Sequence, residues 1–246
     1  MLVVIPARAG SKRIPNKALR RLGKHPLLAY AIASALDVGL DAKVIVASED
    51  AAILDCASYY GADTWQRPLY TATDDAPDIT WLSLFVEAHV GLLEAFVLRR
   101  LTSPFITAST IGRAWLDFSS VPEATAMRAM RPTTEHPNKQ WVRRGRWILP
   151  LITPESWNKD MGVEAWSTPT QLLRRMYVQT AGLEILRAPI VRGGSLTGER
   201  VMPFFLVDEQ ALDINNANDW WMAEQLIEAK VAELPHIEQT PWVNHD

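Results

Sequence analysis

The chain has 246 residues, of which 48% are hydrophobic and 22% charged, and its formal net charge is -3. This length suits one large α/β domain or two small ones, and the composition is that of an ordinary folded protein. The pI near 6.0 argues against general affinity for nucleic acid or anionic membranes, the single cysteine excludes an intrachain disulfide, and no apolar run reaches membrane-spanning length.

A basic loop follows the first expected strand. Residues 2–5 form a short apolar run bounded by Pro6, which is typical of a buried strand in a parallel sheet. Residues 7–24 then carry seven cations and no acidic residue. Because the loop follows a strand, we expect it at the edge of the sheet where open α/β proteins bind ligands.

We interpret this loop as a polyphosphate site. Gly10 would let the backbone approach a ligand closely, and Ser11 adds a hydroxyl donor. Arg8, Lys12 and Lys17 would supply charge around a triphosphate. A solvated basic turn explains the same residues about as well, and the Walker A pattern is absent.

The remaining elements alternate between strands and helices, which predicts a Rossmann-like, mostly parallel sheet with helices on both faces. We expect strands at residues 43–48, 94–101, 124–130, 176–186 and 204–207. Helices are expected at residues 26–36, from a cap at Ser48 or Asp50 to about residue 60, and at residues 79–90, 108–118 and 218–234. Residues 61–68 are expected to be a connection.

Two segments invite other functions. Asp74, Asp75 and Asp78 could suggest a metal site, but helix capping explains acids before a helix better. Residues 140–166 mix tryptophans with arginines, which could suggest nucleic acid. The segment is short and the net charge is negative, so we expect no nucleic-acid partner.

Ordered motifs along nearly the whole chain resemble the acylneuraminate cytidylyltransferase family. They read IPARAGSKRIPNK, GKHPLLAYA, VIVASED, YGADTWQRP, TSP, YVQTAGLEI and ALDINNANDWWMAE. The resemblance implies transfer of CMP from CTP to the anomeric hydroxyl of a sialic-acid-like 2-keto-3-deoxy sugar acid, with release of pyrophosphate and Mg²⁺ as cofactor. It also implies one nucleotidyltransferase domain over residues 1–246, a homodimer, and a dimerisation extension at about residues 140–175. Since the N-terminus lacks a secretory-signal pattern, we expect a cytoplasmic protein with no membrane partner.

The same resemblance assigns roles to individual residues. Arg8, Lys17 and Asp213 would be catalytic, and Asp213 and Asn215 would hold the metal. The nucleotide would be bound by Ala7, Arg8, Gly10, Ser11, Lys12, Lys17 and Arg67, and the sugar acid by Thr102, Ser103, Lys139 and Gln179. Arg100 is added to the sugar-binding residues as a hypothesis from its own chemistry.

Three positions depart from the family pattern. Ala18 stands where the family commonly has Asn, Arg100-Leu101 where it has Gln-Pro, and Asn215 where sialic acid enzymes have Asp. We hypothesise that Arg100 pairs with an anionic group of the acceptor or nucleotide, because guanidinium binds carboxylate and phosphate in bidentate fashion. Two alternatives stay open: a nucleotidyltransferase for 3-deoxy-octulosonate or another sugar, and a nucleotide-binding relative with little catalysis.

Overall fold

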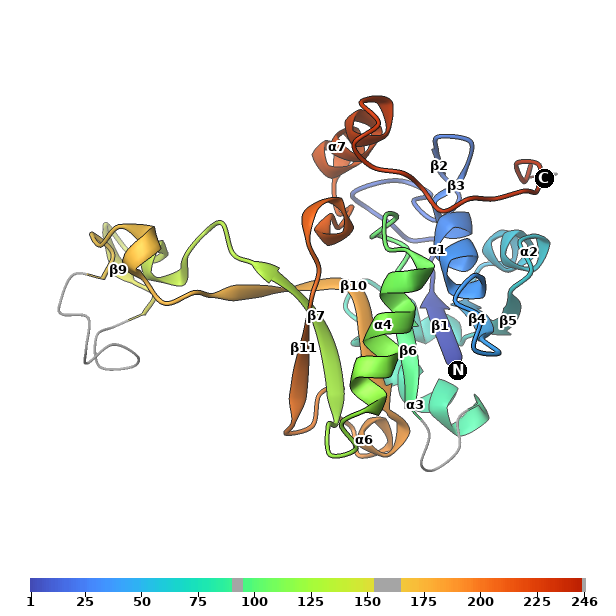
Figure 1. Ribbon diagram of the computed structural model, residues 1–246, viewed down its shortest axis with the longest axis horizontal. Helices are drawn as coiled ribbons and strands as arrows, with labels where there is room; N and C mark the ends of the chain where they lie inside the picture. The colour runs from blue at the N-terminus through green and yellow to red at the C-terminus, as the bar shows by residue number, and fades with distance from the viewer. Residues whose placement is uncertain (90–94, 153–164, 245–246) are drawn as a thin grey trace. The chain divides into compact units, whose positions relative to one another are not determined.

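A computed structural model describes residues 1–89, 95–152 and 165–244 and contains the expected α/β architecture (Figure 1). Its main sheet has seven strands in the order β11-β7-β10-β6-β1-β4-β5. Strand β1 is parallel to β4 and β6, and β4 is parallel to β5, whereas β10 is antiparallel to β6. The strands are β1 (Leu2–Pro6), β4 (Lys43–Ser48), β5 (Asp63–Gln66), β6 (Ala95–Arg99), β7 (Ala126–Pro132), β10 (Tyr177–Arg187) and β11 (Val201–Phe205).

The helices connect these strands and cover the sheet. The longer ones are α1 (Leu27–Leu36), α2 (Ala51–Tyr59), α3 (Asp78–His89), α4 (Ala108–Ser119), α6 (Ala188–Arg192) and α7 (Ala217–Glu228). Single turns of 3-10 helix are η1 (Leu69–Thr71), η2 (Pro137–Lys139), η3 (Thr170–Leu172) and η4 (Asp208–Ala211), and two small hairpins pair β2 (Arg21–Leu22) with β3 (His25–Pro26) and β8 (Trp141–Arg144) with β9 (Trp147–Pro150). Among the described residues, no helix is long and apolar enough to cross a bilayer.

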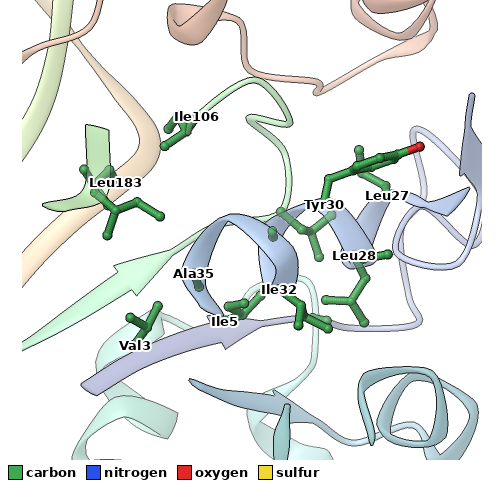
Figure 2. Close-up of a cluster of buried hydrophobic side chains, with 14 of the residues drawn as sticks. Val3, Ile5, Leu27, Leu28, Tyr30, Ile32, Ala35, Ile106 and Leu183 are labelled. Atoms are coloured by element: carbon green, nitrogen blue, oxygen red, sulfur yellow. The ribbon is translucent and has the colours of Figure 1, made fainter. Parts of the chain in front are cut away.

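Both faces of the sheet are buried, as the continuous apolar strands predict. Val3 and Ile5 of β1 pack on one side with α1 and α4, which contact each other (Figures 1 and 2). Val4 points to the opposite side and packs with Trp81 and Phe85 of α3. The expectation of helices on both faces is therefore confirmed.

Several predicted boundaries need correction. Strand β4 has the predicted bounds, and Asp50 caps α2 by accepting a hydrogen bond from the Ile53 amide at 2.9 Å. Residues 61–68 are more than a connection, because they contain edge strand β5. Helix α7 ends at Glu228, before the predicted 234, and Lys230 has a positive φ of 55° that no α-helix continues through.

Other boundaries differ less. Strand β11 begins at Val201, earlier than the predicted residue 204, and ends at Phe205. The predicted helix end at residue 90 and the predicted strand start at residue 94 lie outside the described residues.

The chain separates into two compact units. The first comprises residues 1–129 and 180–246, and the second comprises residues 130–179. The predicted extension at 140–175 falls within the second unit, of which residues 153–164 are not described. This unit contains the β8–β9 hairpin, whose Trp147 is 70% exposed.

Candidate active site

A cavity of about 440 Å³ opens at the carboxyl ends of the parallel strands. Ala7 follows β1, Arg67 follows β5 and Arg100 follows β6, and each lines this cavity. The chain runs outward from β1 to β4 and β5 and then returns to place β6 on the other side of β1. The cavity thus lies where the strand order reverses, the usual ligand position in an open α/β sheet.

Positive charge dominates the cavity wall. Six cationic side chains and two carboxylates line it, namely Arg8, Lys12, Arg13, Lys17, Arg67 and Arg100 against Asp74 and Asp78. Eight of the predicted site residues are among the lining: Ala7, Arg8, Ser11, Lys12, Lys17, Arg67, Arg100 and Thr102. This excess of cations suits a polyanionic ligand.

The basic loop already uses several of its backbone donors. The Ala9 amide donates to Glu49 Oε1 at 2.9 Å, and the Ser11 amide donates to the Ala9 carbonyl at 2.7 Å. The Ala9 and Ser11 amides are therefore paired within the chain. Gly10 borders an adjoining hollow with Ser11 and Lys12, and a Cβ built on it meets nothing within 4 Å.

Arg67 is held by a buried ion pair. Its Nε and Nη2 both donate to Glu49 Oε2 at 3.2 Å, and the two side chains are only 4% and 9% exposed. Glu49 therefore links the end of β4 to Arg67 and to Ala9 of the basic loop. Removing one partner of such a pair costs about 3–5 kcal/mol, because the other charge stays buried and unpaired.

Two loop cations are paired with Asp74. Arg8 Nη1 lies 3.0 Å from Asp74 Oδ1 and also donates to the Thr73 carbonyl at 3.1 Å, and Lys12 Nζ lies 2.5 Å from Asp74 Oδ2. The hydrogen bond from Lys12 lowers the pKa of Asp74, so this carboxylate is ionised at neutral pH. The Asp74 carboxylate thus pairs with two of the cations, Arg8 and Lys12, that the sequence assigns to phosphate binding.

Arg100 belongs to a network of four charges. Its Nε and Nη2 donate to Glu184 Oε1 at 3.4 and 3.3 Å, and its Nη2 also donates to Asp78 Oδ2. Glu184 Oε2 contacts Arg128 Nη1. Burial raises the pKa of Asp78, but the Arg100 guanidinium, together with the Trp81 hydrogen bond and the charge of Arg67, outweighs this effect and holds the pKa below its usual value. Asp78 lies in the first turn of α3, and its carboxylate accepts hydrogen bonds from the Arg100 guanidinium and the Trp81 indole.

Lys17 connects the basic loop to the segment that carries Asp213. Its Nζ donates to the Ile214 carbonyl at 3.0 Å. Burial lowers the pKa of Lys17, and the Asp213 carboxylate opposes this shift. The sequence placed these residues nearly two hundred positions apart, and the fold brings them together.

The Asp213–Asn215 pair offers oxygen atoms to a hard cation. Asn215 Nδ2 donates to Asp213 Oδ2 at 2.8 Å, while the buried Asp213 Oδ1 has no hydrogen-bond partner among the described residues. No group of three or more His, Cys, Asp or Glu side chains in the described part of the chain could hold a metal. Since Mg²⁺ commonly takes one or two protein oxygens together with substrate phosphates and water, the pair fits it. Asp219 instead forms a capping box with Asn216.

The other predicted sugar-binding residues do not line the cavity. Ser103 is buried, and its Oγ has no partner among the described residues. Lys139 and Gln179 belong to the second unit, whereas the cavity is lined by the first. Within that second unit, Lys139 Nζ donates to the carbonyls of Trp166 and Thr168 at 2.7 Å each.

Sequence reasoning assigned Asp74 and Asp78 to helix capping and did not identify Glu49 or Glu184 as partners of the cations. Glu49 directly follows a predicted parallel strand, and this position at a strand end could have indicated that it borders the ligand site. Glu184 lies in mid-strand and Arg99 ends an apolar strand, so neither gave a pattern that marks a site. Arg99 is fully buried, and its hydrogen bonds within the described part of the chain go to main-chain carbonyls.

Comparisons with known proteins agree with this geometry. The family model described as Cytidylyltransferase matches residues 2–135. The chain is 31% identical over 235 residues to CMP-N,N'-diacetyllegionaminic acid synthase of Legionella pneumophila, covering 93% of this chain and 96% of the relative. It is 38% identical over 105 residues to N-acylneuraminate cytidylyltransferase of Escherichia coli, covering 43% of this chain and 25% of that protein.

A solved structure shares the fold. The CTP complex of CMP:2-keto-3-deoxy-manno-octonic acid synthetase superposes with a TM-score of 0.67 at 15% identity, covering 93% of this chain and 98% of the other. The family match and the full-length relative confirm what the sequence motifs predicted: the chain belongs to the cytidylyltransferase family.

Proposed function

We propose that the chain transfers CMP from CTP to the anomeric hydroxyl of a nonulosonic, sialic-acid-like sugar acid and releases pyrophosphate. The cation-lined cavity at the strand ends carries this proposal, because it has the position and charge that a nucleoside triphosphate needs. Membership of the cytidylyltransferase family supplies the reaction type.

The acceptor class follows from the extent of the sequence match. The identity of 31% to the legionaminic acid enzyme extends over 93% of the chain, including the segments that contribute Asp213 and Glu184. The likeness to the octonic acid synthetase is 15% in sequence and supports the fold alone. A nonulosonic acid is therefore favoured over 3-deoxy-octulosonate, which stays the alternative acceptor.

The phosphates would replace the internal acid at the basic loop. Arg8 and Lys12 already converge on Asp74, so an anion at this place would meet two cations at once. Lys17, anchored on the Ile214 carbonyl, would add a third. These groups stabilise charge that accumulates on the departing pyrophosphate, which is the main demand of phosphoryl-transfer chemistry.

Asp213, with Asn215, would hold Mg²⁺. The unpartnered Oδ1 of Asp213 is the oxygen available to a cation, and the Asn215 amide fixes the other oxygen. Bound there, the ion would neutralise phosphate charge and orient the attacking hydroxyl. The chain's own contribution is to keep Asp213 in position beside Lys17.

The second unit would serve assembly, with a second copy of the chain as partner. The β8–β9 hairpin exposes Trp147, Ile148 and Leu149 at 70%, 59% and 46%. Apolar and aromatic side chains of this kind are enriched in dimer interfaces. Lys139 and Gln179 of this unit keep the sugar-binding role that the family motifs imply, as part of this proposal. We place the reaction in the cytoplasm, where CTP is made.

The decisive experiment measures pyrophosphate release with CTP, Mg²⁺ and a panel of sugar acids. The panel holds N-acetylneuraminate, legionaminate-type acids and 3-deoxy-octulosonate. Release that needs CTP and one nonulosonic acid supports the proposal, and release with 3-deoxy-octulosonate alone replaces the acceptor. CTP binding without turnover on any acid would favour a nucleotide-binding relative.

Two variants test the assigned residues in the same assay. Lys17→Ala and Asp213→Ala should each lose at least tenfold in kcat/KM, or about 1.4 kcal/mol of transition-state stabilisation. Gly112→Ala on α4, where a new Cβ makes only an ordinary contact at 3.7 Å with Val38, serves as a control outside the cavity lining. Near-native rates in either site variant would contradict its role.

A further inference from the structure

A fully buried guanidinium ends strand β6 directly behind the cavity. Arg99 is 0% exposed, and no carboxylate of the described residues lies within 4.0 Å of it. Burying an uncompensated charge is costly. Replacing a buried charge by an apolar side chain of similar size is often neutral or stabilising, so stability alone does not explain this residue.

The guanidinium is surrounded by main-chain carbonyls of the segments that shape the cavity. Nη2 donates to the Ser103 carbonyl at 2.7 Å, and Nη1 donates to the Gly182 carbonyl at 3.3 Å and to the Arg100 carbonyl. Ser103 and Arg100 flank the Leu101–Thr102 stretch that lines the cavity. The Arg99 side chain therefore joins the two ends of the turn after β6 and links this turn to β10.

The turn after β6 is hydrogen-bonded in turn to the segment that carries Asp213. The Ile214 amide donates to the Thr102 carbonyl at 2.7 Å, and the Ile214 carbonyl accepts from Lys17 Nζ at 3.0 Å. Hydrogen bonds, joined by the backbone between Thr102 and Ser103, thus connect Arg99 to Ile214 and Lys17. Asp213, next in sequence to Ile214, is also the acid whose charge acts on Arg99.

We propose that Arg99 is a positioning residue: its hydrogen bonds fix the Thr102–Ser103 turn, and the turn places Ile214 so that Asp213 and Lys17 reach their working positions. This inference rests on the proposed function, which gives Asp213 and Lys17 their roles. Arg99 is fully buried and is not among the residues that line the cation-lined cavity, so its influence on that cavity passes through the backbone.

Three variants separate positioning from stability. Arg99→Met keeps the volume and removes charge and donors, whereas Arg99→Lys keeps the charge and loses the planar set of donors. Arg187→Met is the matched control, because Arg187 also donates to main-chain carbonyls, those of Ala124 and Val121. It pairs with Ala95 at the start of β6, the opposite end of the strand from Arg99.

The readouts are hydrogen exchange of the Ile214 amide, the thermal midpoint Tm and kcat/KM for CTP. We expect Arg99→Met and Arg99→Lys to exchange the Ile214 amide at least tenfold faster and to lose at least tenfold in kcat/KM. Arg187→Met should lower Tm without changing Ile214 exchange.

Contrary results are equally distinct. Unchanged Ile214 exchange in both Arg99 variants, or full activity in Arg99→Lys, would overturn the positioning role. Should Arg99→Met fail to fold, Arg99→Lys carries the test. A wild-type chain without CTP-dependent turnover would refute the proposed function, while Ile214 exchange would still decide whether Arg99 holds the segment.

Discussion

Gly182 of β10 is the position where one added carbon atom has the most severe consequence. A Cβ built there lies 2.5 Å from Ser103 Oγ, 2.7 Å from Ile106 Cδ1 and 2.8 Å from Ser103 Cβ. Real Cβ atoms do not approach other atoms this closely, so β10 or the turn after β6 must move. Gly182→Ala should therefore destabilise the protein.

The magnitude follows from the kind of contact. Overpacking a core by a methyl-sized group costs about 1–3 kcal/mol, and the Ser103 Cβ is attached directly to the backbone and cannot rotate away. We expect the upper part of this range, about 2–3 kcal/mol. For a chain of this size that corresponds to a fall in Tm of roughly 4–12 °C.

Urea and thermal unfolding measure the effect, with Gly112→Ala as the control. At Gly112 the new Cβ meets only Val38 Cγ1 at 3.7 Å, and alanine is favoured over glycine in a helix by about 1 kcal/mol. The two substitutions should therefore change stability with opposite signs. The double variant Gly182→Ala/Ser103→Gly should recover part of the loss, because only the flexible Ile106 contact remains. An unfolding free energy of Gly182→Ala within about 0.5 kcal/mol of wild type would refute the reasoning.

Three further predictions concern the basic loop. Burial lowers the pKa of Lys17, so its positive charge is lost at a lower pH than that of an ordinary lysine. The kcat/KM for CTP should therefore fall on the alkaline side below pH 10.5, and Lys17→Arg should abolish this fall. An identical pH profile in both proteins would contradict the assignment. Gly10→Ala should leave Tm unchanged, because its Cβ meets nothing within 4 Å, and should weaken CTP binding severalfold in calorimetric titration; unchanged binding would place the phosphates elsewhere. Asp74→Asn releases Arg8 and Lys12 from their internal acid, so the Kd for CTP should fall severalfold in the same titration, and a Kd that rises would show that Asp74 contributes to binding.

The fold was predictable from sequence where the strands are buried and apolar. β4 has the bounds that the sequence predicted, because Lys43 and the acidic pair after Ser48 frame a continuous apolar run. β5 was missed because it is an edge strand with the sequence Asp-Thr-Trp-Gln and its residues are mostly exposed. The end of α7 was missed because it depends on the backbone angle at Lys230, which no residue type announces.

The site was predictable where one continuous stretch carries it. Arg8, Lys12 and Lys17 were found together because the loop holds a dense run of cations. Their counter-charges come from other elements, and only the fold shows that Asp74 pairs with Arg8 or that Glu184 lies between two arginines. Residue spacing carries no information on such pairs, since the partners of Arg100 are 22 and 84 positions away.

The second unit is inserted between two strands that are neighbours in the sheet. The chain leaves along β7 and returns along β10, which lie side by side in the strand order. An insertion whose two ends are already adjacent can grow at small entropic cost, roughly 0.6 kcal/mol for each doubling of its length. Evolution could therefore lengthen or rebuild residues 130–179 without changing the register of the core strands. In agreement, the match to the family model ends at residue 135, only a few residues into this segment.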